Sequence, residues 1–231
     1  NSFRFTPFAN TLTIEMAKAA MNAEQLGRSG ETDFLTVSFS PTDYIGHEFG
    51  PNSIEVEDTY LRLDADLAAF LNFLDKTIGK NQYTVFLTAD HGAVNVPGFL
   101  KEHKIPAGTY DDAEIQKQLN AWLETKYNLK NAISRIINYQ VYFNDAVVND
   151  QNRQQVTDAT VQQLLGFSFI ANAFELRDLF SAPVPEKLRN MMANGYNMKL
   201  SGDIQFNYKP QWYDGWTKGA SHGVWYAYDA H

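Results

Sequence analysis

The chain has 231 residues, of which 44% are hydrophobic, and it contains no cysteine. A chain of this size can bury a sizeable core in one large domain or two small ones, and without thiols it has no disulfides, no thiolate chemistry and no cysteine-type structural zinc site. The formal net charge of −8 argues against nucleic acid as the main partner, because an acidic surface repels a phosphate backbone.

The sequence opens on an expected helix and an expected strand. Asn10 is suited to cap a helix over about residues 11–26, and Gly27 is suited to end it. The run 33–40 (DFLTVSFS) is short, apolar and β-branched in places, and Pro41 ends it. We therefore expect a buried strand there.

A long amphipathic helix and a second strand follow. Asn52 is suited to cap the helix, apolar residues recur every three or four positions after it, and Gly79 closes it. The run 83–87 (YTVFL) predicts another short buried strand. Strand, long helix and strand together predict a βαβ unit, whose strands usually pair in parallel.

The pattern changes between about residues 99 and 200, where short helices and strands alternate. No Gly/Ser-rich linker separates this region from its surroundings. We therefore expect residues 1–231 to form a single truncated α/β domain, with residues 99–200 as an inserted α+β lobe. The helices and strands expected in and just after this lobe are 112–127, 133–143, 154–165, 167–171, a short helix from Pro185, and 203–208.

Two Asp/His pairs lie just beyond the ends of the two expected strands. Asp43 and His47 follow the first strand, and Asp90 and His91 follow the second. In an open parallel sheet the site lies outside the carboxyl ends of the strands, so both pairs are expected to face one crevice. Oxygen and imidazole ligands of this kind suit zinc better than calcium or copper(I).

Each of these residues also has a purely structural interpretation. Asp43 could be a turn or cap residue, since Asp readily bonds its own backbone. Asp90 and His91 could form an ordinary strand-to-loop turn, and neighbouring side chains of an extended chain point to opposite faces, so only a turn would bring both to one metal. His222, beside Gly223, could be a surface loop histidine. The occurrence of both pairs at strand ends favours the metal site.

Three separated motifs resemble the alkaline phosphatase superfamily, in particular bacterial phosphate-irrepressible alkaline phosphatases and type I phosphodiesterase/nucleotide pyrophosphatases. The motifs are residues 41–52 (PTDYIGHEFGPN), 88–92 (TADHG) and 221–223 (SHG), the last followed by Tyr228 and Asp229. The resemblance runs from Phe5 to the last residue, with motif order and spacing kept, and corresponds to the C-terminal part of the family. The last motif departs from the usual Gly-Thr-x-His-Gly, which puts details of the leaving-group pocket in doubt.

The resemblance implies a fold and a set of metal ligands. The fold is a three-layer α/β/α sandwich with a mostly parallel sheet, of which this chain is a truncated part. The implied cofactor is a pair of zinc ions per intact site. Asp43, His47 and His222 match the three protein ligands of one zinc, and Asp90 and His91 match two ligands of the other.

The implied activity is hydrolysis of small phosphate monoesters through a phospho-Thr or phospho-Ser intermediate. The nucleophile belongs to a segment of the family that has no match in this chain, and the family pattern gives that role to neither Thr42 nor Ser221. We therefore expect no catalytic nucleophile here, and little or no activity from the 231 residues alone. Three alternatives stay open. The first is a phosphodiesterase or nucleotide pyrophosphatase of the same superfamily, and the second is a non-catalytic metal-binding domain that keeps an ancestral site. The third is a relative of sulfatases or phosphoglycerate mutases with calcium or manganese, although the His-rich ligand set weighs against calcium.

Two further histidines are not expected to bind metal. His103 is expected to be a solvated turn residue and His231 the stub of a final strand, so neither is counted as a ligand. No apolar run reaches the ~20 residues of a membrane span and no signal peptide is visible, while the resemblance implies a periplasmic or secreted protein. Four aromatic residues either border the substrate entrance or form a core under a long loop: Trp212, Trp216, Trp225 and Tyr226.

Overall fold

A computed structural model describes residues 2–215 and 218–229 of the chain. These residues fall into two compact units, which we call the helical unit and the sheet unit. The described parts of the helical unit are 2–104, 218–223 and 227–229, and those of the sheet unit are 105–215 and 224–226.

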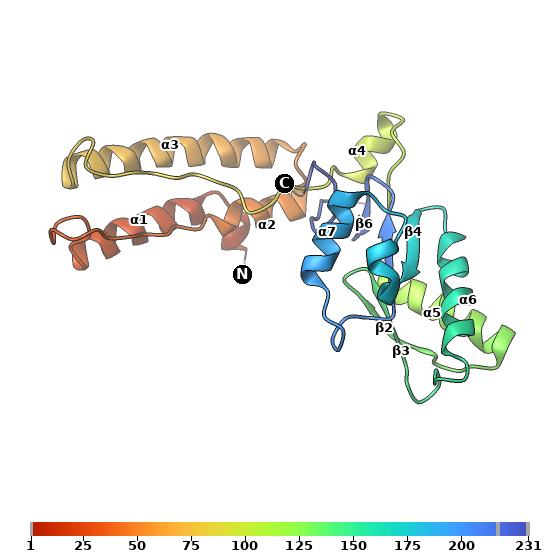
Figure 1. Ribbon diagram of the computed structural model, residues 1–231. Helices are drawn as coiled ribbons and strands as arrows, with labels where there is room; N and C mark the ends of the chain where they lie inside the picture. Colours follow the sequence, from red (N-terminus) through yellow and green to blue (C-terminus); the bar gives the residue numbers. More distant parts are fainter. Residues whose placement is uncertain (1, 216–217, 230–231) are drawn as a thin grey trace. The chain divides into compact units, whose positions relative to one another are not determined.

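The helical unit is built on two long helices, α1 and α3, which pack against one another (Figure 1). The long helix expected from the sequence is α3, and Ser53 rather than Asn52 caps it, by accepting a hydrogen bond from the Val56 N–H. α1 begins earlier than expected, so Asn10 lies inside the helix and is buried instead of capping it. The helices of this unit are η1 (Phe3–Phe5), α1 (Phe8–Ala23), α2 (Ser40–Phe49), α3 (Ile54–Thr77) and α4 (Pro97–Glu102).

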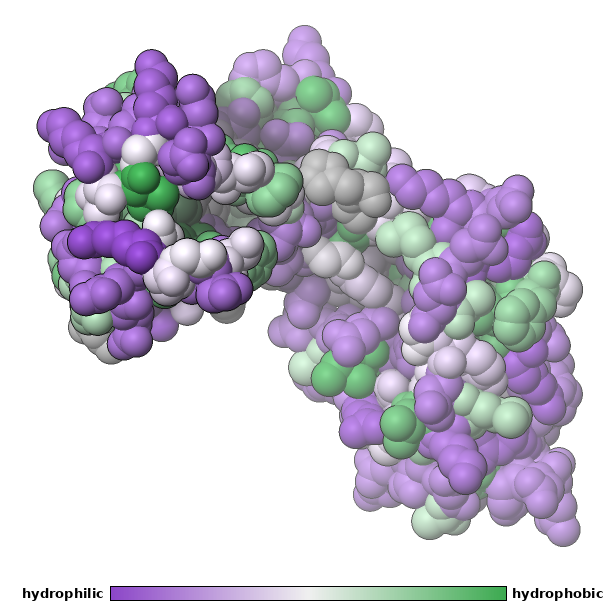
Figure 2. Space-filling view, turned by 60° about the vertical axis from the view of Figure 1, so that its left-hand side comes forward, coloured by the Kyte–Doolittle hydropathy of each residue, from purple (hydrophilic) through white to green (hydrophobic). Residues whose placement is uncertain are grey.

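The two buried strands expected in this unit are not formed. Residues 33–39 and 83–89 have no strand assignment, and no backbone hydrogen bond links 34–38 or 83–89 to another described residue. Their apolar side chains are largely exposed, with Phe34 at 84% and Phe86 at 83% exposure. The physical reason is the lack of a partner: a strand needs a neighbouring backbone to satisfy its N–H and C=O groups, and no described segment lies in that position. Figure 2 shows hydrophobic atoms around a hollow in this unit.

The sheet unit contains an antiparallel sheet of order β2-β3-β5-β4. The strand expected over 133–143 is a hairpin, because Asn138 and Tyr139 both take positive φ angles and turn the chain between β2 and β3. Buried apolar residues of α5 and α6 pack with those of the sheet into one core, which includes Leu119, Leu164 and Phe206. The bounds are α5 (Asp112–Tyr127), β2 (Ile133–Ile137), β3 (Gln140–Phe143), α6 (Arg153–Leu165), β4 (Ile170–Glu175) and β5 (Ile204–Tyr208).

The rest of the sheet unit consists of a two-stranded parallel ladder and a smaller apolar cluster. β1 (Gly108–Tyr110) pairs in parallel with β6 (Trp212–Asp214), which is the single parallel pairing among the described residues. The smaller cluster is formed by residues of η2 (Leu176–Ser181) and α7 (Glu186–Gly195), together with Phe174 of β4. The mostly parallel sheet expected from the sequence is therefore not present in the described part of the chain, whose sheets are small and mixed.

Candidate metal centre

Helix α2 places Asp43 and His47 one turn apart on the same face. Pro41 occupies a first-turn position, where its missing N–H costs no intrahelical hydrogen bond. Asp43 lies in the first turn and His47 in the last, and residues four apart on a helix are neighbours. The Nε2 atom of His47 lies 3.4 Å from Oδ2 of Asp43. The spacing seen in the sequence therefore brings the carboxylate and the imidazole together.

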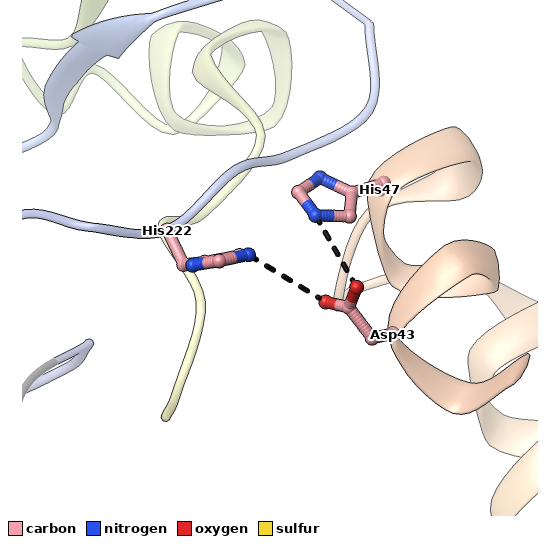
Figure 3. Close-up of side chains that lie close together, drawn as sticks. All are labelled: Asp43, His47 and His222. Atoms are coloured by element: carbon pink, nitrogen blue, oxygen red, sulfur yellow. Dashed lines mark ion pairs between the residues drawn. The ribbon is translucent and has the colours of Figure 1, made fainter. Parts of the chain in front are cut away.

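The third side chain, His222, comes from a loop that is held by backbone contacts within the helical unit. The Ala220 N–H donates to the carbonyl of His47 at 3.1 Å, and the Val94 N–H donates to the carbonyl of Ser221 at 2.9 Å. These bonds fix the loop directly before its histidine, whose Nε2 lies 3.9 Å from Oδ1 of Asp43. Figure 3 shows both imidazoles directed toward the carboxylate, each paired with a different oxygen.

Gly219 allows this loop to approach α2. Its φ angle is +79°, a conformation that favours glycine. A Cβ atom at this position would lie 2.1 Å from the carbonyl oxygen of His47, which no real side chain tolerates. The glycine is therefore required for the contact that delivers the third histidine.

The His47 and His91 rings present the same nitrogen toward Asp43. Nδ1 of His47 lies 2.9 Å from the carbonyl of Ala220, and Nδ1 of His91 lies 2.7 Å from the carbonyl of Gly92. A carbonyl can only accept, so in the neutral form of each ring Nδ1 carries the proton and Nε2 keeps its lone pair. Outer partners of this kind orient the histidine ligands of metal sites.

Asp90 and His91 lie beside this group. Nε2 of His91 is 3.6 Å from Asp90 and 4.0 Å from Asp43, and its ring stacks on His222 with centroids 3.6 Å apart. The chain bends at Asp90, and the N–H of Gly92, which follows the pair, donates to the carbonyl of Asp229 at 2.8 Å. A Cβ on Gly92 would lie 2.4 Å from the Tyr228 carbonyl oxygen, so this close backbone approach also depends on glycine.

The surroundings of His222 favour its neutral imidazole. Burial lowers the pKa of His222, and the neighbouring His91 lowers it further, although the carboxylate of Asp43 acts in the opposite direction. A neutral imidazole with a free lone pair is the form that binds a metal. One ligand atom each of Asp43, His47 and His222 lies within 4.8 Å of the others. Two histidines and one carboxylate form a donor set that fits a catalytic zinc ion with an open position.

Histidine and tryptophan residues that the sequence does not predict to be metal ligands have other contacts in the structure. His103 ends α4, where its Nδ1 meets the Phe99 carbonyl at 2.8 Å, away from the cluster of Asp43, His47 and His222. Trp212 packs against the main core of the sheet unit and Trp225 against its smaller cluster, which agrees with the interpretation of these two as core residues. Trp216 and His231 lie outside the described residues.

Sequence reasoning missed the groups that hold the ligands. The Ala220 carbonyl and the side chain of Asn10, which bonds to Thr42 at 3.2 Å, are distant in sequence from the residues they contact. Gly219 is the one local signal, because a glycine shortly before a candidate ligand often marks a close backbone approach.

Known proteins resemble the chain over most of its length. Residues 4–223 match the family model described as type I phosphodiesterase / nucleotide pyrophosphatase. Over 231 residues the chain is 46% identical to alkaline phosphatase PafA of Elizabethkingia meningoseptica, a match that covers 99% of this chain and 42% of that protein. It is also 46% identical, over 232 residues, to a Myroides odoratus protein named calcium-transporting ATPase, covering 98% of this chain and 42% of that protein.

A solved structure agrees with these matches. The crystal structure of wild-type alkaline phosphatase PafA matches the chain with a TM-score of 0.90 at 45% identity, and the match covers 98% of this chain and 44% of that one. The chain therefore spans less than half the length of the relatives it matches.

Proposed function

Because the chain belongs to the type I phosphodiesterase / nucleotide pyrophosphatase family, we propose that it is part of a zinc-dependent hydrolase that cleaves small phosphate monoesters. One observation carries this proposal: the ligand atoms of Asp43, His47 and His222 gather within 4.8 Å of one another. The alkaline phosphatase-like structure of the chain supports the same class of reaction. We propose a periplasmic or secreted location, and none of the described helices is long and apolar enough to cross a membrane.

The residues of the site have separate tasks in this proposal. Asp43, His47 and His222 would hold one zinc ion, and the carboxylate would offset part of its charge. The Ala220 carbonyl keeps the Nδ1 proton of His47 in place, so that Nε2 faces Asp43. A zinc ion held there supplies Lewis-acid polarisation of a phosphoryl oxygen and neutralises negative charge in a loose transition state.

Asp90 and His91 would contribute to a second zinc site. We propose that its other ligands, and the Thr or Ser nucleophile that forms the phospho-enzyme, lie in the part of the protein outside these 231 residues. We do not assign that role to Thr42, whose hydroxyl accepts a hydrogen bond from the amide of Asn10.

For the complete protein we propose a more extensive fold than the described residues form. We propose a three-layer α/β/α sandwich in which residues 33–39 and 83–89 are strands of a mostly parallel sheet. Residues 99–200 would then be a lobe inserted into that single domain. The exposure of Phe34 (84%) and Phe86 (83%) supports this, since both apolar runs have the composition of strands buried on two faces.

A phosphodiester or nucleotide pyrophosphate is the second candidate substrate, because the matching family model carries that description. The choice depends on side chains that contact the non-bridging oxygens and the second ester group. Rates on p-nitrophenyl phosphate and bis-p-nitrophenyl phosphate distinguish the two candidates.

A non-catalytic metal-binding domain is the alternative of another class. The name calcium-transporting ATPase, carried by the Myroides relative, points to different chemistry for that protein. The donor set of this chain weighs against a calcium site, because calcium is bound by six to eight oxygen ligands and this cluster offers two imidazoles and one carboxylate.

A chimera tests the proposed activity. The part of the Elizabethkingia alkaline phosphatase that lies outside the match is joined to these 231 residues, and p-nitrophenyl phosphate hydrolysis is measured with added zinc. We expect activity from the chimera, none from the 231 residues alone, and a loss of about 100-fold or more in the chimera carrying Asp43→Asn. A folded, zinc-loaded but inactive chimera would favour the non-catalytic alternative, and full activity of the 231 residues alone would show that the nucleophile is present.

A further inference from the structure

Asn10 is a fully buried amide at the contact between α1 and α2. Its exposure is 1%, and its Nδ2 donates to the Thr42 hydroxyl oxygen at 3.2 Å. Burying an amide costs free energy unless its polar atoms are hydrogen-bonded. A polar residue kept at such a position therefore calls for a reason beyond packing.

The amide is satisfied only in part. Its Oδ1 atom is buried and has no hydrogen-bond partner among the described residues. An unsatisfied buried polar atom costs about 1–3 kcal/mol, and an apolar side chain of similar shape would avoid this cost. Stability alone therefore does not explain an asparagine here.

The partner of Asn10 lies directly before a proposed zinc ligand. Thr42 belongs to the first turn of α2 and precedes Asp43. Phe39, at the N-cap position of α2, makes no side-chain capping bond, so this turn lacks the usual local anchor. The link to α1 and the bond from the Thr42 N–H to the Phe39 carbonyl, 3.2 Å long, hold it instead.

We propose that Asn10 is a positioning residue for the metal site, which acts by fixing Thr42 and thereby the carboxylate of Asp43. Zinc–ligand distances must hold to within about 0.2 Å, and adjacent Cα atoms are only 3.8 Å apart, so a shift of Thr42 moves its neighbour directly. The inference rests on the zinc site of the proposed function, and it assigns no contact between Asn10 and the metal or the substrate.

The test separates stability from metal binding. Asn10→Leu replaces the amide by an apolar side chain of similar size, and we expect the thermal midpoint of the metal-free chain to stay the same or rise. Zinc affinity, measured by competition with a chelating dye, is expected to fall about tenfold, the lower end of the effect of outer-shell partners. A purely structural role predicts that stability and affinity fall together or not at all.

Thr42 supplies the second half of the test. Thr42→Val removes the hydroxyl and is expected to lower zinc affinity about as much as Asn10→Leu, with no further loss in the double variant. Thr42→Ser keeps the hydroxyl and is expected to keep the affinity. Thr59→Val is the control, since Thr59 is a buried threonine of the same unit whose hydroxyl bonds within α3 to the Glu55 carbonyl.

The outcomes distinguish this inference from the proposed function. If the unaltered chain does not bind zinc, the proposed site fails and the inference fails with it. If the unaltered chain binds zinc and Asn10→Leu and Thr42→Val bind it equally well, the inference alone is overturned. The Co²⁺ absorption spectrum gives a second readout, because displacement of the carboxylate alters the ligand field while a change in stability does not.

Discussion

The sheet unit and the helical unit differ in how far they bury the side chains that the sequence predicts to be buried. In the sheet unit, Leu119 of α5, Leu164 of α6 and Phe206 of β5 are all 0% exposed. In the helical unit, Phe34 and Phe86 of the two apolar runs are 84% and 83% exposed. The composition of these residues is similar, so the difference lies in their partners. An apolar pattern predicts a face that can be buried, and a neighbouring element has to be present to bury it.

The largest expected effect comes from a pair of truncations, one in each unit. Leu119→Ala removes a fully buried side chain from the core of α5 and the sheet, and should lower the free energy of unfolding by about 2–5 kcal/mol. Phe86→Ala removes a larger side chain that is 83% exposed, and should change it by less than about 0.5 kcal/mol. Urea titrations followed by circular dichroism measure both.

Equal losses of stability in these two variants would contradict the comparison. Such a result would mean that residues 83–89 are buried in solution by a contact that the structure of the single chain does not contain. Size-exclusion chromatography with light scattering would then show whether a second copy provides that contact.

The second prediction concerns the glycine that brings the His222 loop to α2. Gly219→Ala would place a methyl group 2.1 Å from the His47 carbonyl oxygen, and we expect zinc affinity to fall by about tenfold or more because the loop must move. Gly30→Ala is the control, since Gly30 has a similar φ of +84° but nothing within 4 Å of the added Cβ.

Comparing the two glycine variants isolates the effect on zinc affinity of the clash between the added methyl group and His47. Both should lose about 1–2 kcal/mol from the left-handed backbone conformation, whereas only the variant near His47 should lose zinc. A normal zinc affinity in Gly219→Ala would show that the loop does not need its close approach to α2.

The third prediction uses a buried carboxyl of the sheet unit. Burial raises the pKa of Asp112 from 3.8 to about 6, against the opposing hydrogen bond from the Tyr208 hydroxyl. The protonated form is thus favoured in the folded state, so the contribution to stability is complete below about pH 3.8 and is lost as the pH rises through about 6. Asp112→Asn should therefore stabilise the chain at pH 8, by about 1 kcal/mol after allowance for solvent screening.

The same variant should have little effect at pH 4, where Asp112 is largely protonated in the folded state. Thermal midpoints at the two pH values provide the measurement. A stabilisation of equal size at both would contradict a raised pKa, and would point to packing instead.

The smallest effect is expected at His103, which ends α4 and contacts Phe99 rather than the metal site. His103→Ala should leave zinc affinity unchanged and should change the free energy of unfolding by less than about 0.5 kcal/mol. A fall in zinc affinity would show that histidines outside the cluster contribute ligands.

The sequence predicts the parts of this molecule that local chemistry decides. Helices α3 and α5 follow from their apolar spacing, and Asp43 with His47 follows from a four-residue spacing on α2. Long-range contacts were not predictable: the Ala220 carbonyl meets His47 across 173 residues. The burial of Asn10 likewise depends on where α2 packs, which the local sequence does not contain. From its local sequence alone, Asn10 is interpreted as a helix cap.

The same distinction explains the error about the strands. The runs 33–40 and 83–87 have the apolar, β-branched composition of buried strands, but residues 33–39 and 83–87 have no strand partners among the described residues. A strand forms only when a second segment pairs with it. A prediction made from the composition of one segment therefore fails when no partner segment lies beside it.

The most direct test of the central claim is an equilibrium zinc titration of the 231-residue chain and its His222→Asn variant. The chain contains no cysteine, so thiolates cannot mask the result. We predict that the unaltered chain binds zinc and that the variant binds it about 100-fold more weakly or worse, because one of three protein ligands is lost. Equal affinities in the two proteins would contradict a metal centre formed by Asp43, His47 and His222.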